Sequence, residues 1–175
     1  MKKVLITTLG CKVNQYESAA FRTGLEEAGM KVVSRGADAD IVVINTCAVT
    51  GSAGAQSRQA LRRALRNNPH ARIIVTGCYA ELAAEELAEE KELQGRNYSL
   101  IGNSKKDRLV EHLLEEEGAN EDLFGTIAAA SEICRLPVRR FGDRSRAYLR
   151  IQDGCACRSD DSATAAAPIC ASRTA

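Results

Sequence analysis

The sequence predicts an α/β fold with a doubly wound, mostly parallel sheet of the flavodoxin or Rossmann kind. Short apolar runs, at residues 41–45 (IVVIN) and 72–76 (RIIVT) for example, alternate along the chain with longer amphipathic segments. These runs lack the period-2 alternation of a half-exposed strand, which indicates strands that are buried on both faces. Strands of this kind, when separated by helices, form parallel sheets that helices cover on both sides.

Local patterns place the elements in order. We expect strands at residues 4–7, 31–34, 41–45, 72–76 and 99–101, and helices at residues 14–28, 53–67, 80–93 and 105–117. The first helix is amphipathic and ends at Gly29, a residue type that commonly follows helices. Asn68 and Pro69 end the second helix, because proline cannot continue one. The third expected helix is strongly acidic, and Gly118 ends the fourth.

The periodic pattern is lost after this fourth helix, which suggests a domain boundary. We expect residues 1–118 to form one domain, and residues 119–145, which include Pro137 and several arginines, to be a linker. Residues 146–152 are typical of one further strand. Residues 156–175 contain seven alanines and one large aliphatic side chain, so we expect a disordered tail that cannot build a core.

The composition excludes several classes of protein. The 175 residues are 45% hydrophobic and 27% charged, which is typical of a globular chain and not of a disordered, collagen-like or disulfide-stapled one. No apolar run approaches the roughly 18–20 residues of a membrane-spanning helix. The apolar run after Lys2 and Lys3 is short and no cleavage site follows it, so we interpret it as a strand rather than a signal peptide. We therefore expect a cytoplasmic protein without a membrane partner.

The net charge of +1 hides an uneven distribution. Residues 1–75 carry 11 basic and 5 acidic side chains, residues 76–125 carry 5 and 13, and residues 126–175 carry 8 and 5. This pattern predicts one basic face rather than a wholly basic protein.

Arg58, Arg62 and Arg66 are spaced so that they form one ridge on the second expected helix. The ridge either contacts RNA phosphates or is a plain solvated face. We interpret the acidic stretch at residues 81–92 as a solvated face. The sequence contains no GxGxxG or Walker-type loop, so it gives no reason to expect a dinucleotide or nucleoside-triphosphate site.

Three of the seven cysteines come just after expected strands. Cys11, Cys47 and Cys78 come after the first, third and fourth strands, at the carboxyl ends where open α/β sheets bind ligands. In a reducing compartment such cysteines are metal or cluster ligands, reactive thiols or simply buried apolar side chains. Three thiolates suit a [4Fe–4S] cluster with one iron left open better than a closed four-ligand zinc site. We assign no role to Cys134.

Polar residues flank these cysteines. Asn14, Asn45 and Thr46 are candidates for contacts to cluster sulfurs or to an incoming sulfur species, or they are plain turn and cap residues. We assign no catalytic residue.

Three motifs resemble those of a known family. Residues 9–18 (LGCKVNQYES), 45–50 (NTCAVT) and 75–80 (VTGCYA) are similar to the three cysteine motifs of radical S-adenosylmethionine methylthiotransferases. The first motif most resembles the branch that modifies threonylcarbamoyladenosine beside the anticodon of tRNA. The resemblance covers about residues 2–155. The branches that act on isopentenyladenosine or on a ribosomal protein remain alternatives within the family.

The resemblance implies two clusters and a set of partners. Cys11, Cys47 and Cys78 would bind a [4Fe–4S] cluster as the sulfur-donor site, with tRNA and a sulfur donor as partners. Residues 146–155 (RAYLRIQDGC) look like the first strand of the radical barrel, which ends at Cys155. The family's Cys-x3-Cys-x2-Cys motif would continue at positions where this chain has Ser159 and Ser162.

The departure from that motif limits what we expect of this chain. S-adenosylmethionine would bind only in the intact family, and this chain alone would be inactive and would bind tRNA weakly. A hypothesis from another class is a noncatalytic flavodoxin-like domain that binds a metal or a partner through its strand-end thiols.

Overall fold

The structure is a computed structural model of the chain and describes residues 1–33, 38–48, 52–115, 122–125, 135–141 and 148–149. Within these residues the elements are β1 (Lys3–Thr8), α1 (Lys12–Glu27), β2 (Lys31–Val33), β3 (Ile41–Thr46), α2 (Ala53–Asn67), β4 (Arg72–Gly77), α3 (Cys78–Leu82), α4 (Ala84–Ala88), β5 (Tyr98–Ile101), the 3-10 helix η1 (Asn103–Arg108) and α5 (Leu109–Leu114).

The five strands form one parallel sheet in the order β2-β1-β3-β4-β5. Val4 pairs with Ile41, and Ile41 pairs in turn with Arg72. This is the strand order of flavodoxin-like proteins. The expected doubly wound α/β fold is confirmed.

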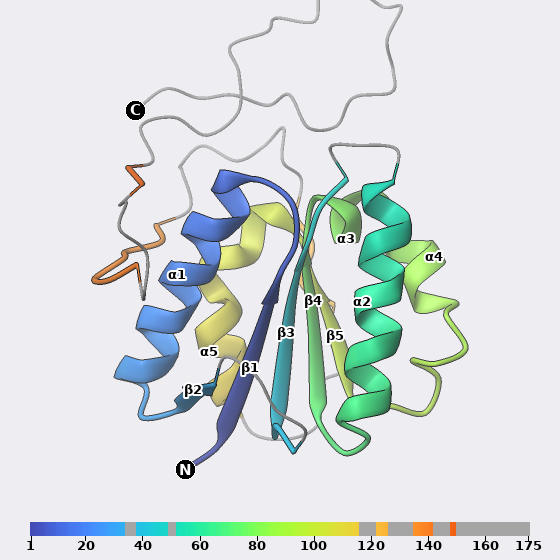
Figure 1. The fold of residues 1–175 in the computed structure, drawn as a ribbon, viewed down its shortest axis with the longest axis horizontal. Helices are drawn as coiled ribbons and strands as arrows, with labels where there is room; N and C mark the ends of the chain where they lie inside the picture. Colours follow the sequence, from blue (N-terminus) through green and yellow to red (C-terminus); the bar gives the residue numbers. More distant parts are fainter. Residues whose placement is uncertain (34–37, 49–51, 116–121, 126–134, 142–147, 150–175) are drawn as a thin grey trace, which may run out of the picture.

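Helices cover both faces of the sheet and enclose two apolar cores (Figure 1). On one face α1 and α5 pack against the strands, with Phe21 and Leu109 fully buried. On the other face α2, α3 and α4 pack against the strands, with Leu61 and Leu87 fully buried. All six residues of β3 are buried, as expected for a central strand without polar alternation.

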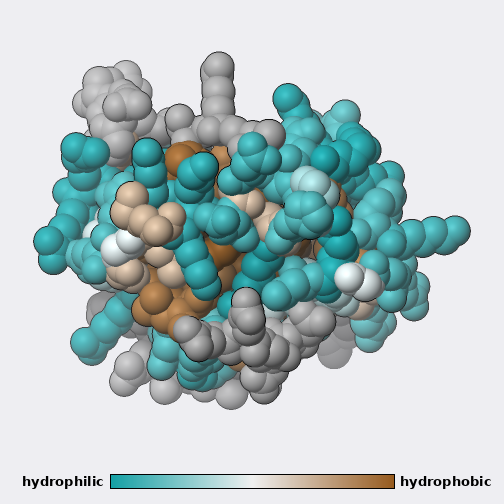
Figure 2. Space-filling model, turned by 90° about the horizontal axis from the view of Figure 1, so that it is seen from below, coloured by the Kyte–Doolittle hydropathy of each residue, from teal (hydrophilic) through white to brown (hydrophobic). Residues whose placement is uncertain are grey.

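The surface at the amino ends of the strands is mostly hydrophilic, with a limited hydrophobic area between charged and polar side chains (Figure 2). None of the helices that the structure describes is both long enough and apolar enough to cross a membrane.

Two expected helices were wrong in their extent. The helix predicted at residues 80–93 is two short helices, α3 and α4, which are separated at Ala83 (φ −127°, ψ 37°). Like charges four residues apart, such as Glu81 and Glu85, disfavour one continuous helix here. The helix predicted at residues 105–117 begins as the 3-10 helix η1, and α5 spans only Leu109–Leu114.

The described parts of the expected linker pack on the domain. Leu123 forms an isolated parallel bridge with Ile101 beside β5. Leu136 is 8% exposed and joins the core under α1, and its carbonyl oxygen accepts a hydrogen bond from Tyr16 Oη at 3.0 Å. Arg139 donates its backbone N–H to Thr23 Oγ1 at 3.2 Å. These segments therefore contribute to the fold of the domain.

Several sequence expectations fall outside the described residues. They are the strand at residues 146–152 apart from residues 148–149, the tail at residues 156–175, and the positions of Cys134 and Cys155. Within the described pair, the Tyr148 ring meets the Phe141 ring edge-on, with centroids 5.8 Å apart.

Candidate functional site

Three cysteines lie at the edge of the sheet where the strands end. Cys11 is the residue before α1, and Cys47 and Cys78 follow β3 and β4 directly. Because β1, β3 and β4 are neighbours, the three residues share one edge. This edge is the switch point of the fold, since the chain leaves β1 toward β2 on one side and resumes at β3 on the other. All three thiols are free.

A glycine brings the first two cysteine loops into contact. Gly10 has φ +82°, and a Cβ at this position would lie 2.3 Å from both Cβ and Sγ of Cys47. Only glycine tolerates this backbone conformation together with so close an approach. The loop that carries Cys11 therefore lies directly against the Cys47 side chain.

The third cysteine shares an electrostatic environment with the other two. Burial raises the pKa of the Cys78 thiol above its ordinary value, and the positive charge of Lys106 opposes that increase. Glu17, Cys11 and Cys47 each raise the pKa of Cys78 further, by smaller amounts. The three thiols therefore interact at one edge, together with one carboxylate and one ammonium group.

Asn14 joins the loop after β1 to the end of β3. Its Nδ2 donates hydrogen bonds to the carbonyl oxygens of Leu9 at 2.8 Å and Thr46 at 2.7 Å. Its Oδ1 accepts a hydrogen bond from Cys11 Sγ at 3.8 Å. Asn14 is 1% exposed. This buried side chain thus fixes Cys11 relative to β3.

Two hydroxyl groups hold the other cysteine loops. Thr46 Oγ1 donates to the carbonyl oxygen of Thr76 at 2.6 Å and accepts from the N–H of Ala80 at 3.1 Å, so it joins β3 to β4 and α3. Ser57 Oγ accepts from the N–H of Cys47 at 3.4 Å and donates to its carbonyl oxygen at 3.2 Å. The backbone on both sides of Cys47 and of Cys78 is therefore tied to a neighbouring element.

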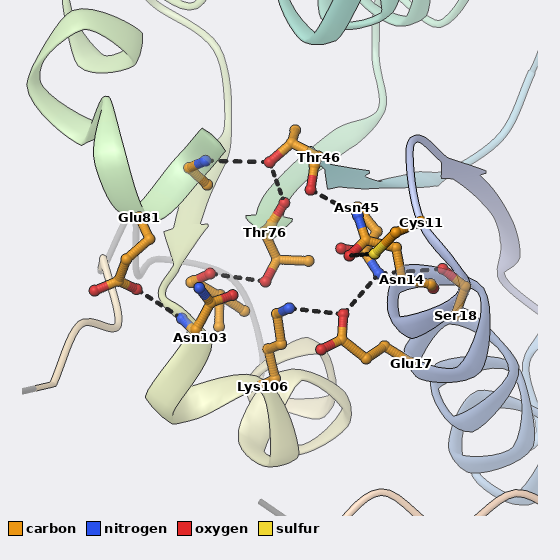
Figure 3. Close-up of polar contacts among 12 residues, drawn as sticks. Cys11, Asn14, Glu17, Ser18, Asn45, Thr46, Thr76, Glu81, Asn103 and Lys106 are labelled. Atoms are coloured by element: carbon orange, nitrogen blue, oxygen red, sulfur yellow. Dashed lines mark hydrogen bonds and ion pairs between the residues drawn. The ribbon is translucent and has the colours of Figure 1, made fainter. Parts of the chain in front are cut away.

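A buried ion pair joins α1 to η1 on the side of the sheet where Cys11 lies (Figure 3). Lys106 Nζ donates to Glu17 Oε2 at 2.7 Å, and both side chains are buried. Asn45 Nδ2 donates to the same carboxylate oxygen at 3.2 Å, to Ser18 Oγ at 3.3 Å and to the carbonyl oxygen of Asn14 at 3.1 Å. Asn45 Oδ1 is buried and accepts no hydrogen bond from the described residues.

The part of the chain that forms this cysteine edge matches a known protein family. Residues 3–95 match the family described as uncharacterized protein family UPF0004. That segment extends from β1 past α4 and contains Cys11, Cys47 and Cys78. The chain belongs to the UPF0004 family.

Relatives of this UPF0004 chain carry methylthiotransferase names. The chain is 37% identical over 157 residues to the threonylcarbamoyladenosine tRNA methylthiotransferase MtaB of Bacillus subtilis (strain 168), covering 89% of this chain and 34% of that protein. Identity to the enzyme of the same name from Aquifex aeolicus (strain VF5) is 36% over 155 residues, which cover 87% of this chain and 37% of that protein. Identity to the ribosomal protein uS12 methylthiotransferase RimO of Moorella thermoacetica (strain ATCC 39073 / JCM 9320) is 30% over 155 residues, which cover 89% of this chain and 35% of that protein.

These matches confirm the resemblance to methylthiotransferases that the cysteine motifs indicated. The chain spans about a third of the length of the curated relatives it matches.

The UPF0004 chain also has site residues that sequence reasoning missed. Glu17 lies on the buried side of α1 with Phe21 and Leu25. A charged residue within an apolar stripe of a helix could have indicated a buried polar contact. Lys106 had no such signal, because it is 89 residues from Glu17 and meets it only in the folded chain.

The arginine ridge of α2 is largely engaged by the acidic segment next to it. Arg58 pairs with Glu86 at 3.0 Å and also donates to Tyr79 Oη. Arg62 pairs with Glu90 at 3.0 Å and with Glu92 at 3.3 Å. Residues 81–92 thus form a face that pairs with the ridge and still contacts solvent, since Glu86 and Glu92 are 57% and 45% exposed. Arg66 has no ion pair within the described residues.

Proposed function

We propose that this chain is the N-terminal part of a tRNA-modifying methylthiotransferase that adds a methylthio group to threonylcarbamoyladenosine. In this proposal Cys11, Cys47 and Cys78 bind a [4Fe–4S] cluster that serves as the sulfur-donor site. The single observation that carries the proposal is the presence of three free thiols at one strand-end edge of a UPF0004 domain. The names of the relatives supply the enzyme class and the tRNA substrate.

Three thiolates suit a [4Fe–4S] cluster with one open iron better than a closed four-ligand zinc site. Among the described residues, no group of three His, Cys, Asp or Glu side chains is arranged to hold one metal ion. Glycine at positions 10 and 77 lets the cysteine loops approach closely, because a Cβ on Gly10 would meet the Cys47 side chain and a Cβ on Gly77 would meet the Thr46 backbone.

When bound by three thiolates, a [4Fe–4S] cluster offers one iron for an exogenous sulfur ligand. The chain's own residues prepare the site. The three thiols must lose their protons to become ligands. Asn14 and Thr46 hold the loops in place through buried hydrogen bonds. They contact backbone and Cys11, which supports a positioning role for these two residues.

The substrate branch and the partners follow from the relatives. Identity to the threonylcarbamoyladenosine enzymes exceeds identity to the uS12 enzyme, which favours tRNA over a ribosomal protein as substrate. A sulfur donor is a further expected partner. The complete enzyme would use S-adenosylmethionine at a second cluster, of which Cys155 would be one ligand. Because Ser159 and Ser162 replace the other two, we expect no activity from this chain alone.

The test is anaerobic reconstitution with iron and sulfide, followed by absorption spectroscopy and iron analysis. We expect about four irons per wild-type chain, and loss of the cluster in Cys11→Ala, Cys47→Ala and Cys78→Ala, because two thiolates hold a cluster poorly. Cys134→Ala is the matched control and should retain the cluster. A colourless protein that binds zinc, or no metal, would instead support the noncatalytic flavodoxin-like alternative.

A further inference from the structure

The first two turns of α2 contact the loops of two cysteines. Gly54, Ser57 and Arg58 are three and four residues apart, so they lie on one face of the helix. Each of them contacts either Cys47 or the residue that follows Cys78. One short stretch of α2 therefore touches both the loop after β3 and the loop after β4.

Ser57 holds the loop of Cys47. Its side chain is buried, and its hydroxyl bonds to both backbone groups of Cys47. The hydroxyl oxygen accepts from the N–H at 3.4 Å, and the hydroxyl donates to the carbonyl oxygen at 3.2 Å. Because both bonds come from one residue of α2, the backbone of Cys47 is fixed relative to this helix.

Tyr79 holds the loop of Cys78 against the same helix. It follows Cys78 directly and is 7% exposed. Its ring packs on Gly54, where a built Cβ would lie 3.0 Å from Cε2 of the ring. Its Oη accepts a hydrogen bond from Arg58, whose Cζ lies 5.7 Å from the ring centroid. The guanidinium thus provides the partner that a buried tyrosine hydroxyl needs, and it also attracts the face of the ring.

Helix α3 depends on such contacts because it is short. It spans only Cys78–Leu82, and a helix of five residues is not stable without tertiary packing. On the other side of Cys78, Gly77 has no side chain that could hold the loop. The buried ring of Tyr79 is therefore well placed to set the direction in which α3 leaves the sheet, and with it the position of the thiol.

We propose that α2 sets the positions of Cys47 and Cys78 relative to each other, through Ser57 and through Arg58 acting on Tyr79. Arg58 and Tyr79 are thus positioning residues and not ligands. The inference rests on the proposed function, in which both thiols bind one cluster and must keep a fixed separation. It gives Arg58 a role that differs from contact with RNA.

The first test measures alkylation of the cluster-free protein by iodoacetamide, followed by mass spectrometry of tryptic peptides. Cleavage after lysine and arginine places Cys11, Cys47 and Cys78 in three separate peptides, so each thiol is measured by itself. Tyr79→Phe removes only a hydroxyl and changes no charge. It should speed alkylation of Cys78 roughly fivefold, the change in open population that one lost hydrogen bond of about 1 kcal/mol produces. The rate at Cys11 should not change.

Ser57→Ala is the reciprocal variant. It should speed alkylation of Cys47 by a similar factor and leave the rate at Cys78 unchanged. Arg58→Met should act on Cys78 as Tyr79→Phe does, since both variants break the same hydrogen bond.

Arg62→Met is the matched control for Arg58→Met. Arg62 lies one turn later on the same ridge, and its guanidinium pairs with Glu90 and Glu92 rather than with Tyr79. This variant should leave all three alkylation rates unchanged. Urea unfolding of the cluster-free variants checks that each of them is folded.

The second test uses the reconstituted cluster. Loss of iron to a chelator, followed by absorption under anaerobic conditions, should be several-fold faster in Tyr79→Phe than in wild type. The reason is that a loosened Cys78 leaves only two firmly held ligands, which hold a cluster poorly. Arg62→Met should lose iron at the wild-type rate.

The outcomes separate this inference from the proposed function. A wild-type chain that binds no iron overturns the proposed function, while the alkylation rates still decide whether α2 positions the two thiols. A wild-type rate at Cys78 in Tyr79→Phe, or iron loss no faster in this variant, overturns the inference alone. Equal increases at all three cysteines, or an increase in Arg62→Met, also overturn it, because they would indicate a general loosening of the domain. Increases confined to the cysteine that each variant is expected to release support it.

Discussion

Gly77 lies against the backbone of Thr46 at the end of the sheet. A Cβ on Gly77 would lie 2.2 Å from the carbonyl oxygen and 2.6 Å from the amide nitrogen of Thr46. It would also lie 2.8 Å from Asn45 Oδ1, and Gly77 has φ +101°. Position 77 therefore accepts no side chain. The close approach of the ends of β3 and β4 at this glycine sets the position of Cys78, the next residue.

Gly77→Ala should strongly destabilise the domain. Both the backbone conformation and the contact with Thr46 oppose a methyl group, so we expect a loss of about 3 kcal/mol or more in the free energy of unfolding, measured by urea denaturation. Gly29→Ala is the control, because Gly29 has φ +76° but no atom within 4 Å of its built Cβ. Its loss should be about 1–2 kcal/mol, the cost of the left-handed conformation alone. Equal losses would contradict the contact with Thr46.

Gly10→Ala should affect the thiol site more than the fold. The new methyl group would meet Cβ and Sγ of Cys47 at 2.3 Å, so the Cys47 side chain must move. We expect a folded protein by circular dichroism that reconstitutes with much less iron than wild type. Gly95→Ala has a similar φ of +74° with no atom within 4 Å of its Cβ, and it should reconstitute normally. Normal iron content in Gly10→Ala would show that the cluster does not need Cys47 in its present position.

Leu136→Ala should destabilise the domain although Leu136 lies outside the regular elements. Its side chain is 8% exposed and packs in the core under α1. Removing a buried leucine side chain costs about 2–5 kcal/mol, and the partial exposure here favours the lower end of that range. Leu114→Ala, at a position that is 51% exposed, should change the free energy of unfolding by less than about 0.5 kcal/mol. A negligible effect at Leu136 would mean that this segment does not stabilise the domain.

Much of the fold could be predicted because the buried strands have a strong local signature. The run IVVINT has no polar alternation, and all six of its residues are buried in β3. The helix predicted at residues 53–67 has the observed bounds of α2. The break at Ala83 was missed because helical periodicity in the sequence does not report the repulsion between neighbouring glutamates. The packing of Leu136 was missed because a single apolar residue near a proline has no periodicity.

The candidate site could be predicted in part, because the buried strands that position the cysteines have a strong local signature. The positions of Cys11, Cys47 and Cys78 followed from the ends of three strands, which the pattern located well. The Glu17–Lys106 pair could not be predicted, since it joins two elements that are distant in the sequence. The role of the three thiols as cluster ligands stays a prediction.

The last prediction concerns RNA binding by the α2 ridge. Free phosphate contacts from Arg58, Arg62 and Arg66 would each contribute about 0.7–0.9 to the slope of log affinity against log salt, or roughly two to three units together. In the folded chain Arg58 and Arg62 already pair with carboxylates of the acidic segment. We therefore expect the triple arginine-to-glutamine variant to lower the magnitude of the slope by only about one unit, measured with an unmodified tRNA.

The ion pairs also predict that removing two carboxylates increases the affinity for tRNA. Glu90→Gln combined with Glu92→Gln removes the carboxylates that hold Arg62, so its guanidinium becomes available to phosphate and the local negative charge decreases. This variant should bind tRNA more tightly than wild type at low salt, with a steeper salt dependence. Arg22→Gln, which removes a basic side chain from α1 on the other face of the sheet, should leave the slope unchanged. If the triple arginine variant and the wild type have the same slope, the ridge does not contact RNA, and Arg58 and Arg62 serve to hold α4 and the segment after it against α2.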